Sequence, residues 1–100
     1  VDTHDASKQL EALGNPTRLA ICQLLVKAGR NGVNVGEINE VLTIPPSTLS
    51  HHIAKLVNAG LVSQRRKGRE LICHPEPGAM DELVLYLADN CCGEDSEIWG

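Results

Sequence analysis

Almost no aromatic side chains are available to build the core of this chain. Its 100 residues include one tryptophan, one tyrosine and no phenylalanine, whereas 42% of them are hydrophobic. The core must therefore be built from Leu, Ile, Val and Ala. This composition argues against sheets that depend on aromatic cross-strand pairs and against RNA-binding sheets that stack bases on aromatic rings. The length favours one domain, because soluble domains most often hold about 100–150 residues.

Helix-breaking residues divide the chain into five expected helices. Asn15 followed by Pro16 is typical of a helix start, because asparagine caps free N–H groups and proline is tolerated at the first position. Pro45 and Pro46 cannot lie inside a helix and force a tight break. With apolar residues at helical spacing, the expected helices run from about Asp5 to Leu13, from Pro16 to about Lys27, from Val35 to Leu42, from Pro46 or Ser47 to Ala59, and from about Ala79 to Cys92.

A β-hairpin with a basic tip is expected after the fourth helix. Its strands are predicted over Leu61 to Lys67 and Arg69 to His74, with Gly68 at the turn. Two helices joined by a short turn and followed by such a hairpin form a winged helix-turn-helix. The expected fold is therefore mainly α, with five helices and a two-stranded wing, in a single domain over residues 1–100.

Charged residues are distributed unevenly along the chain. No Asp or Glu lies between Val41 and Arg69, and no Lys or Arg follows His74. The net charge is −4, yet the basic middle of the chain can bind polyanions. The alternative interpretation of this middle segment is a solvated charged face.

The fourth helix and the hairpin carry side chains that suit duplex DNA. A helix fits the major groove, where the residues of its first turns reach base edges. Its free N–H groups attract phosphate, and cations on a wing contact phosphates or enter the minor groove. The candidate DNA-binding residues are Ser47, Thr48, Ser50, His51, His52, Lys55, Arg65, Arg66, Lys67 and Arg69.

A winged-helix module that binds only protein is the alternative to a DNA-binding protein. The predicted exposed face is polar and cationic rather than apolar, which favours DNA. The neighbours His51 and His52 do not favour a metal site, because adjacent helical side chains point about 100° apart.

Three stretches of the sequence closely resemble the ArsR/SmtB family of bacterial repressors. They are 13–19 (LGNPTRL), 46–56 (PSTLSHHIAKL) and 59–62 (AGLV), within a resemblance that covers about Leu10 to Cys92. The resemblance implies a homodimer made by helices over 3–13 and 79–92. It also implies that the dimer binds a two-fold symmetric DNA operator and releases it on a metal, metalloid or redox signal.

Two sensor sites known in that family have no counterpart here. A Cys-Val-Cys type of box would lie in the third helix, but the matching stretch 33–39 (VNVGEIN) holds no cysteine. A zinc site on the last helix needs carboxylates and histidines. Asp81 is present, but no histidine follows His74.

Cys73, Cys91 and Cys92 are the candidate inducer ligands, whereas Cys22 lies among apolar residues and is expected in the core. Zinc prefers four tetrahedral ligands, and thiolates select thiophilic species. The expected inducer is therefore arsenic(III), methylarsenite or antimony(III), bound by two or three thiolates. If the last helices pair antiparallel, Cys91 approaches Cys73 of the partner subunit. A redox sensor that uses the same thiols is the rival hypothesis.

Other classes of protein find little support in the sequence. No apolar run approaches the ~20 residues that cross a bilayer, and no signal-peptide pattern is present. The expected location is the cytoplasm, where cysteines stay mostly as thiols. No glycine-rich phosphate loop, nucleophile elbow or paired carboxylates indicate an enzyme, and no cofactor is expected to be required.

Overall fold

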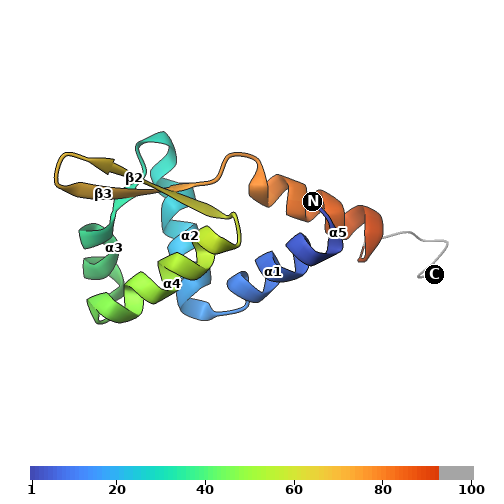
Figure 1. Cartoon of the computed structure of the whole chain (residues 1–100), viewed down its shortest axis with the longest axis horizontal. Helices are drawn as coiled ribbons and strands as arrows, with labels where there is room; N and C mark the ends of the chain where they lie inside the picture. Colours follow the sequence, from blue (N-terminus) through green and yellow to red (C-terminus); the bar gives the residue numbers. More distant parts are fainter. Residues whose placement is uncertain (93–100) are drawn as a thin grey trace.

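A computed structural model, which describes residues 1–92, confirms the winged helix-turn-helix (Figure 1). The sheet has three antiparallel strands in the order β1-β3-β2. Along the chain the elements are α1 (Thr3–Leu13), α2 (Pro16–Ala28), the 3₁₀ turn η1 (Gly29–Asn31), β1 (Val33–Asn34), α3 (Val35–Leu42), α4 (Pro46–Asn58), β2 (Val62–Lys67), β3 (Glu70–Pro75) and α5 (Ala79–Asn90).

Side-chain caps fix the starts of the first three helices. The Asn15 side-chain oxygen accepts a hydrogen bond from the Arg18 amide at 3.1 Å, as expected for α2. Asn34 caps α3 in the same way. Asp2 caps α1, so this helix begins at Thr3, two residues before the expected start, because a capped N-terminus satisfies amides that would otherwise fray.

The turn between α3 and α4 brings these helices together as the helix-turn-helix. Thr43 takes a left-handed conformation with φ of 50°, and Pro46 occupies the first position of α4. The Asn39 side-chain amide donates to the Ile44 carbonyl across the turn. The two prolines therefore break the chain where the sequence predicted, and Asn39 holds the break in shape.

The wing differs from the predicted two-stranded hairpin because β1 adds a third strand. Val33 pairs with Cys73 and Asn34 with Ile72 on β3. A strand of two residues has no periodic pattern of its own, so it forms only through this long-range pairing. The turn also moves by one residue, since Gly68 and Arg69 both lie in the loop and Lys67 faces Glu70.

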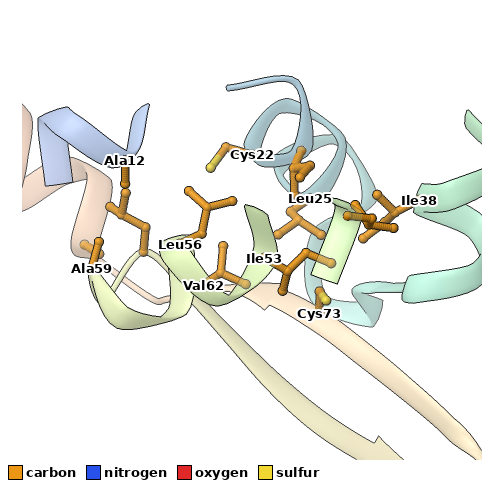
Figure 2. Packing of buried hydrophobic residues seen from close by; sticks show 13 residues of the cluster. Ala12, Cys22, Leu25, Ile38, Ile53, Leu56, Ala59, Val62 and Cys73 are labelled. Atoms are coloured by element: carbon orange, nitrogen blue, oxygen red, sulfur yellow. The ribbon is translucent and has the colours of Figure 1, made fainter. Parts of the chain in front are cut away.

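Mostly aliphatic side chains from the helices and from strands β2 and β3 fill the core (Figure 2). Leu49, Ile53 and Leu56 come from one face of α4 and are almost completely buried. They meet Ile21 and Leu25 of α2. The core thus fixes which face of α4 points inward, and it leaves the opposite face for solvent.

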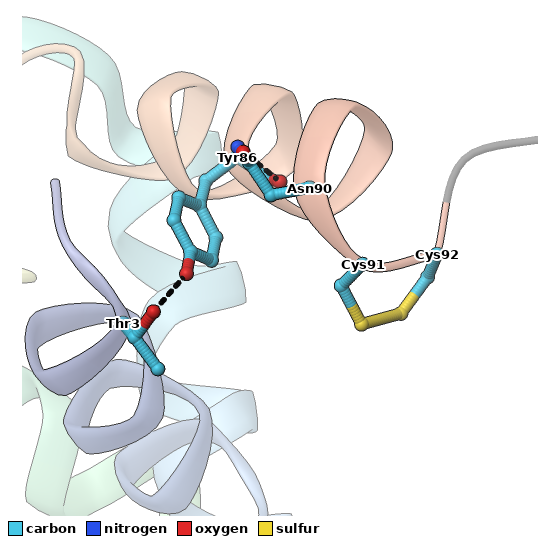
Figure 3. Close-up of a disulfide and its surroundings, with 5 residues drawn as sticks. All are labelled: Thr3, Tyr86, Asn90, Cys91 and Cys92. Carbon is cyan, nitrogen blue, oxygen red and sulfur yellow. Dashed lines mark hydrogen bonds between the residues drawn. A yellow bond between two sulfur atoms is a disulfide. The ribbon is translucent and has the colours of Figure 1, made fainter.

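Helices α1 and α5 lie side by side at the end of the molecule opposite to the wing (Figure 1). The hydroxyls of Thr3 and Tyr86 hydrogen-bond across them (Figure 3). Helix α5 ends at Asn90 rather than at the expected Cys92, because Cys91 leaves the helical conformation. Within residues 1–92, none of the helices has the length and apolar character of a membrane span.

Candidate nucleic-acid interface

The outward face of α4 is short, polar and exposed. Because Leu49, Ile53 and Leu56 are buried, the residues between them point outward. Pro45, before the helix, has no side-chain oxygen to cap it, so the first amides of α4 are left for an external acceptor. The predicted base-reading residues that the structure places in solvent are Ser47, Thr48, Ser50, His51 and Lys55.

His52 does not share this exposure, because it is half-buried and bonded to α2. A guanidinium nitrogen of Arg18 donates to His52 Nδ1 at 3.1 Å. The same side chain donates through Nε to the Ala12 carbonyl at 2.7 Å. Arg18 thus connects the end of α1 to the middle of α4, and His52 helps to position the helix.

Lys55 also connects α4 to α1, through a surface ion pair. Its ammonium lies 3.7 Å from the Glu11 carboxylate, with 43% and 76% of the two side chains exposed. Pairs this exposed contribute little to stability. The Lys55 ammonium can therefore bind a phosphate, and doing so gives up only its weak ion pair with Glu11.

The wing presents its four cations at and beside a tight turn. Gly68 has φ of 63° at the first loop position, which fits a two-residue type II′ hairpin. All four of the predicted wing residues are exposed. Side chains alternate along a strand, so Arg65 and Lys67 lie on one face of β2 and Arg66 on the other.

These wing cations have no carboxylate partners in the structure. Among residues 1–92, the only ion pair is the one between Lys55 and Glu11. At one end of the domain, therefore, positive charges stand without ion pairs on Arg65, Arg66, Lys67 and Arg69. A polyanion is the partner that such a surface attracts most strongly.

Known proteins resemble this chain in sequence and in fold. A family model described as a helix-turn-helix domain matches residues 13–65. The transcriptional activator HlyU of Vibrio cholerae is 35% identical over 81% of this chain and 77% of its own length. A putative arsenical resistance operon repressor, ArsR2 of Halobacterium salinarum, is 30% identical over 84% of this chain and 68% of its own.

Solved structures agree with these sequence matches. The structure of HlyU from V. cholerae superposes with a TM-score of 0.71 at 28% identity, covering 89% of this chain and 95% of HlyU. An ArsR family transcriptional regulator, RHA00566, gives a TM-score of 0.78 and covers 99% of this chain and 94% of its own. Because the identity is only 22%, this second similarity shows the fold alone.

The chain belongs to the ArsR/SmtB family of winged-helix transcriptional regulators. Members of the family bind DNA, and they are regulators of transcription rather than enzymes. The exposed face of α4 and the cationic wing are the parts of this member that suit that task.

The cysteines divide into a buried pair and an exposed pair. Cys22 and Cys73 are both buried, as expected for Cys22. Burial raises the pKa of both thiols, which keeps them protonated and unreactive near neutral pH. Gln64 donates a hydrogen bond to the Cys73 sulfur at 3.6 Å.

Cys91 and Cys92 lie exposed at the end of α5 and are joined by a disulfide (Figure 3). Thiols were expected for this pair, whereas the structure has it in the oxidised form. The two residues are adjacent and both side chains reach solvent. These two sulfurs can therefore meet each other and an external reagent.

The predicted three-cysteine site is not assembled within one chain. In the described part of the chain, no group of three or more His, Cys, Asp or Glu side chains is placed to hold a metal ion. The Cys73 side chain points from β3 into the core. Cys91 and Cys92 follow the C-terminal end of α5. A site that joins them between subunits stays a prediction.

Two arginines with defined contacts in the structure were not predicted from the sequence. Arg18 follows the α2 cap within the stretch that resembles the family, but its contact with His52 spans 34 positions and leaves no local signal. Arg30 sits in η1, where a loop between glycines gave no indication of a neighbour. The fold brings it beside Arg65 of the wing.

We expect mild acid to loosen the contact between α4 and α2. Desolvation and then Arg18 lower the pKa of His52 below its usual value, so the folded protein binds this proton less readily than the unfolded chain. The stabilising contribution is complete above the unfolded pKa of about 6.5 and is lost as pH falls through the lower folded pKa. Between about pH 7 and pH 5 the melting temperature should fall more for the parent than for His52→Gln.

The glutamine variant keeps an oxygen that accepts from Arg18 but cannot bind the proton. Thermal unfolding followed by circular dichroism at the two pH values makes the comparison. The other three histidines are the same in both proteins, so the comparison isolates His52. Parallel pH dependence of the two melting temperatures would show that His52 is not the responsible group.

Proposed function

We propose that this protein is a homodimeric repressor that leaves its operator when a trivalent arsenical binds cysteine thiolates. Paired α4 helices and wings of the two subunits read a two-fold symmetric site. The observation that supports DNA binding is the unpaired cationic wing beside a polar, exposed α4. The observation that supports thiol sensing is the exposed pair Cys91 and Cys92 at the end of α5.

An uncovered apolar surface on α5 supports the dimer. Val84 and Leu85 are 58% and 61% exposed, and Met80 is 37% exposed. Leu10 on the neighbouring α1 is 43% exposed. Apolar side chains gathered in this way favour burial against a partner. A two-fold dimer through these helices would set the recognition helices about 34–36 Å apart, one turn of DNA.

The adjacent cysteines suit a monomethylated arsenical once they are reduced. Methylarsenite carries one carbon and two hydroxyls on arsenic. Two thiols displace the hydroxyls, so that two S–As bonds form and two water molecules leave. Thiolates are soft ligands that select such thiophilic centres. The resemblance to ArsR2, whose name connects it with arsenical resistance, agrees with this proposal.

Inorganic arsenic(III) or antimony(III) would call for a third thiolate. Cys73 of the partner subunit is the candidate we proposed from the sequence, opposite Cys91 and Cys92. Because Cys73 is fully buried, its use requires β3 to open away from the core. The methylated arsenical needs no such movement, and we favour it for that reason.

The disulfide between Cys91 and Cys92 favours a redox sensor as the second candidate function. Hydrogen peroxide would oxidise the two thiols to the disulfide and would be reduced to two water molecules. The oxidised pair has no thiolate to offer to arsenic. Both inducers therefore act on the reduced pair, and oxidation by peroxide prevents the binding of arsenic.

Helix α1 provides a route from the cysteines to α4. Its first turn contacts α5 through Thr3 and Tyr86. Its last turn contacts α4 directly through Glu11 and Lys55, and again through Arg18, which bonds to both Ala12 and His52. A shift of α5 therefore changes the position of α4. A coupling of about 1–3 kcal/mol would weaken operator binding roughly 5- to 150-fold.

DNA binding itself is tested with wing variants and salt. The probes are a duplex selected from a random pool by the reduced protein and a scrambled duplex of equal length. Arg65→Ala and Arg66→Ala should weaken binding to both duplexes, and each lost phosphate contact should flatten the log–log salt slope by about 0.9 per subunit. Fluorescence anisotropy at several salt concentrations measures both effects.

Lys27→Ala is the matched control, since Lys27 is an exposed cation on α2 that lines a different hollow from those beside the wing. Its removal changes the net charge equally but should leave the slope near that of the parent. Wing variants with the slope and affinity of the parent would contradict the proposal. A parent protein that binds neither duplex would contradict it as a whole.

A further inference from the structure

A cationic hollow lies between η1 and the outward face of the wing. Its volume is about 350 Å³, and it is open to solvent. The wing contributes Arg65, Arg66, Lys67, Ile72 and His74 to its lining, and the preceding loop contributes Arg30 and Asn31. Residues far apart in the sequence therefore form one surface.

The strand register explains why these side chains share a face. Cys73 pairs with Gln64 and is buried, so that position marks the core side of the sheet. Arg65 pairs with Ile72, one position along, and alternation places this pair on the outer side. Lys67 and His74 follow the same alternation.

Gly32 holds η1 against the wing. A Cβ atom at this position would lie 2.6 Å from the Cys73 carbonyl oxygen and 2.7 Å from the His74 ring. Only a residue without a side chain allows such an approach. The loop that carries Arg30 is therefore fixed beside β3 rather than free to swing away.

The lining of the hollow holds cations and no carboxylate. None of the residues that line it is acidic, and within residues 1–92 none of its cations forms an ion pair. Acidic residues lie outside this lining: Glu70 pairs with Lys67 next to the turn, and Glu76 and Asp81 line the adjoining hollow together with Arg30 and Arg65. Like charges held close together favour an anion between them.

We propose that this hollow binds a backbone phosphate of the DNA beside the wing, with Arg30 as a ligand. The inference rests on the proposed DNA binding and extends it to a part of the chain outside the helix-turn-helix and hairpin. The minor groove is only about 6 Å wide, so a wing inside it has one backbone on each side. Arg30, Arg65 and Lys67, which line the hollow, face one of these two backbones.

The test compares Arg30→Ala, Arg30→Lys and Lys27→Ala on the selected and scrambled duplexes. Loss of one phosphate contact per subunit should lower the log–log salt slope of Arg30→Ala by about 1.8 for the dimer. The loss should be equal on both duplexes, because a phosphate carries no base identity. Arg30→Lys should recover most of the slope, and Lys27→Ala should keep the slope of the parent.

An Arg30→Ala slope equal to that of Lys27→Ala would overturn the inference, even where wing variants behave as expected. If the parent bound neither duplex, the proposed function would fail first, so the two failures are distinct. Equal melting temperatures of Arg30→Ala and parent establish that the fold is intact.

Inorganic phosphate tests the other source of the same chemistry. The melting temperature is measured in sodium phosphate and in sodium chloride at equal ionic strength. If phosphate stabilises the parent but not Arg30→Ala while the DNA salt slopes are equal, the hollow binds a free anion and the proposed contact with DNA is wrong. A lower slope for Arg30→Ala supports the contact with or without phosphate stabilisation.

Discussion

A Cys91→Ser variant should stay on its operator at a methylarsenite concentration that releases the parent protein. Two S–As bonds close the ring that Cys91 and Cys92 form with one arsenic atom, and a single remaining thiol cannot close it. Cys92→Ser should fail in the same way. The parent should lose roughly 5- to 150-fold in operator affinity, the range of a coupling of 1–3 kcal/mol, and both variants should lose almost nothing.

The measurement is fluorescence anisotropy on the selected duplex, with a phosphine reductant present to keep the pair as thiols. Cys22→Ala is the control, because Cys22 is buried and should not contribute to release. Cys73→Ser distinguishes the inducers. It should respond normally to methylarsenite and lose the response to inorganic arsenite if that ion takes a third thiolate from β3.

If Cys91→Ser leaves its operator at the methylarsenite concentration that releases the parent protein, the pair is not the inducer site. Peroxide without reductant tests the redox hypothesis on the same variants. If peroxide releases the parent and methylarsenite does not, the disulfide rather than an arsenic complex is the signal.

Local signals in the sequence were sufficient to predict the helices of this fold. Asn15 and Asn34 cap α2 and α3 as expected from their side chains, because capping depends only on residues within one turn. Pro46 similarly starts α4. The basic wing and the polar face of α4 could be predicted in the same way, because charged residues and the spacing of apolar residues are local features of the sequence.

Contacts between distant segments account for what the sequence did not predict. Strand β1 exists only through its pairing with β3. His52 is drawn partly inward by Arg18 of α2, although its place on the helix predicted exposure. Cys73 faces the core because the register sets it opposite Gln64, and no local pattern gives that register.

Gly32 is the position where a small substitution should cost the most stability. Its φ of 69° and ψ of −172° belong to a region that is essentially restricted to glycine, at a cost of about 1–3 kcal/mol for other residues. Gly32→Ala also places a Cβ 2.6 Å from the Cys73 carbonyl oxygen. Overpacking of this kind adds about 1–3 kcal/mol. The free energy of unfolding should therefore fall by about 2–6 kcal/mol, a large part of the 5–15 kcal/mol typical of a domain.

Gly29→Ala separates the two causes. Gly29 has a similar backbone conformation, with φ of 70° and ψ of −144°, but no atom lies within 4 Å of an added Cβ. Chemical denaturation of both variants should show a loss of about 1–3 kcal/mol for Gly29→Ala and a larger loss for Gly32→Ala. The difference measures the contact between η1 and β3, and equal losses would show that this contact is not tight. Because the same contact holds Arg30 beside the wing, Gly32→Ala should also lower the salt slope of DNA binding toward that of Arg30→Ala.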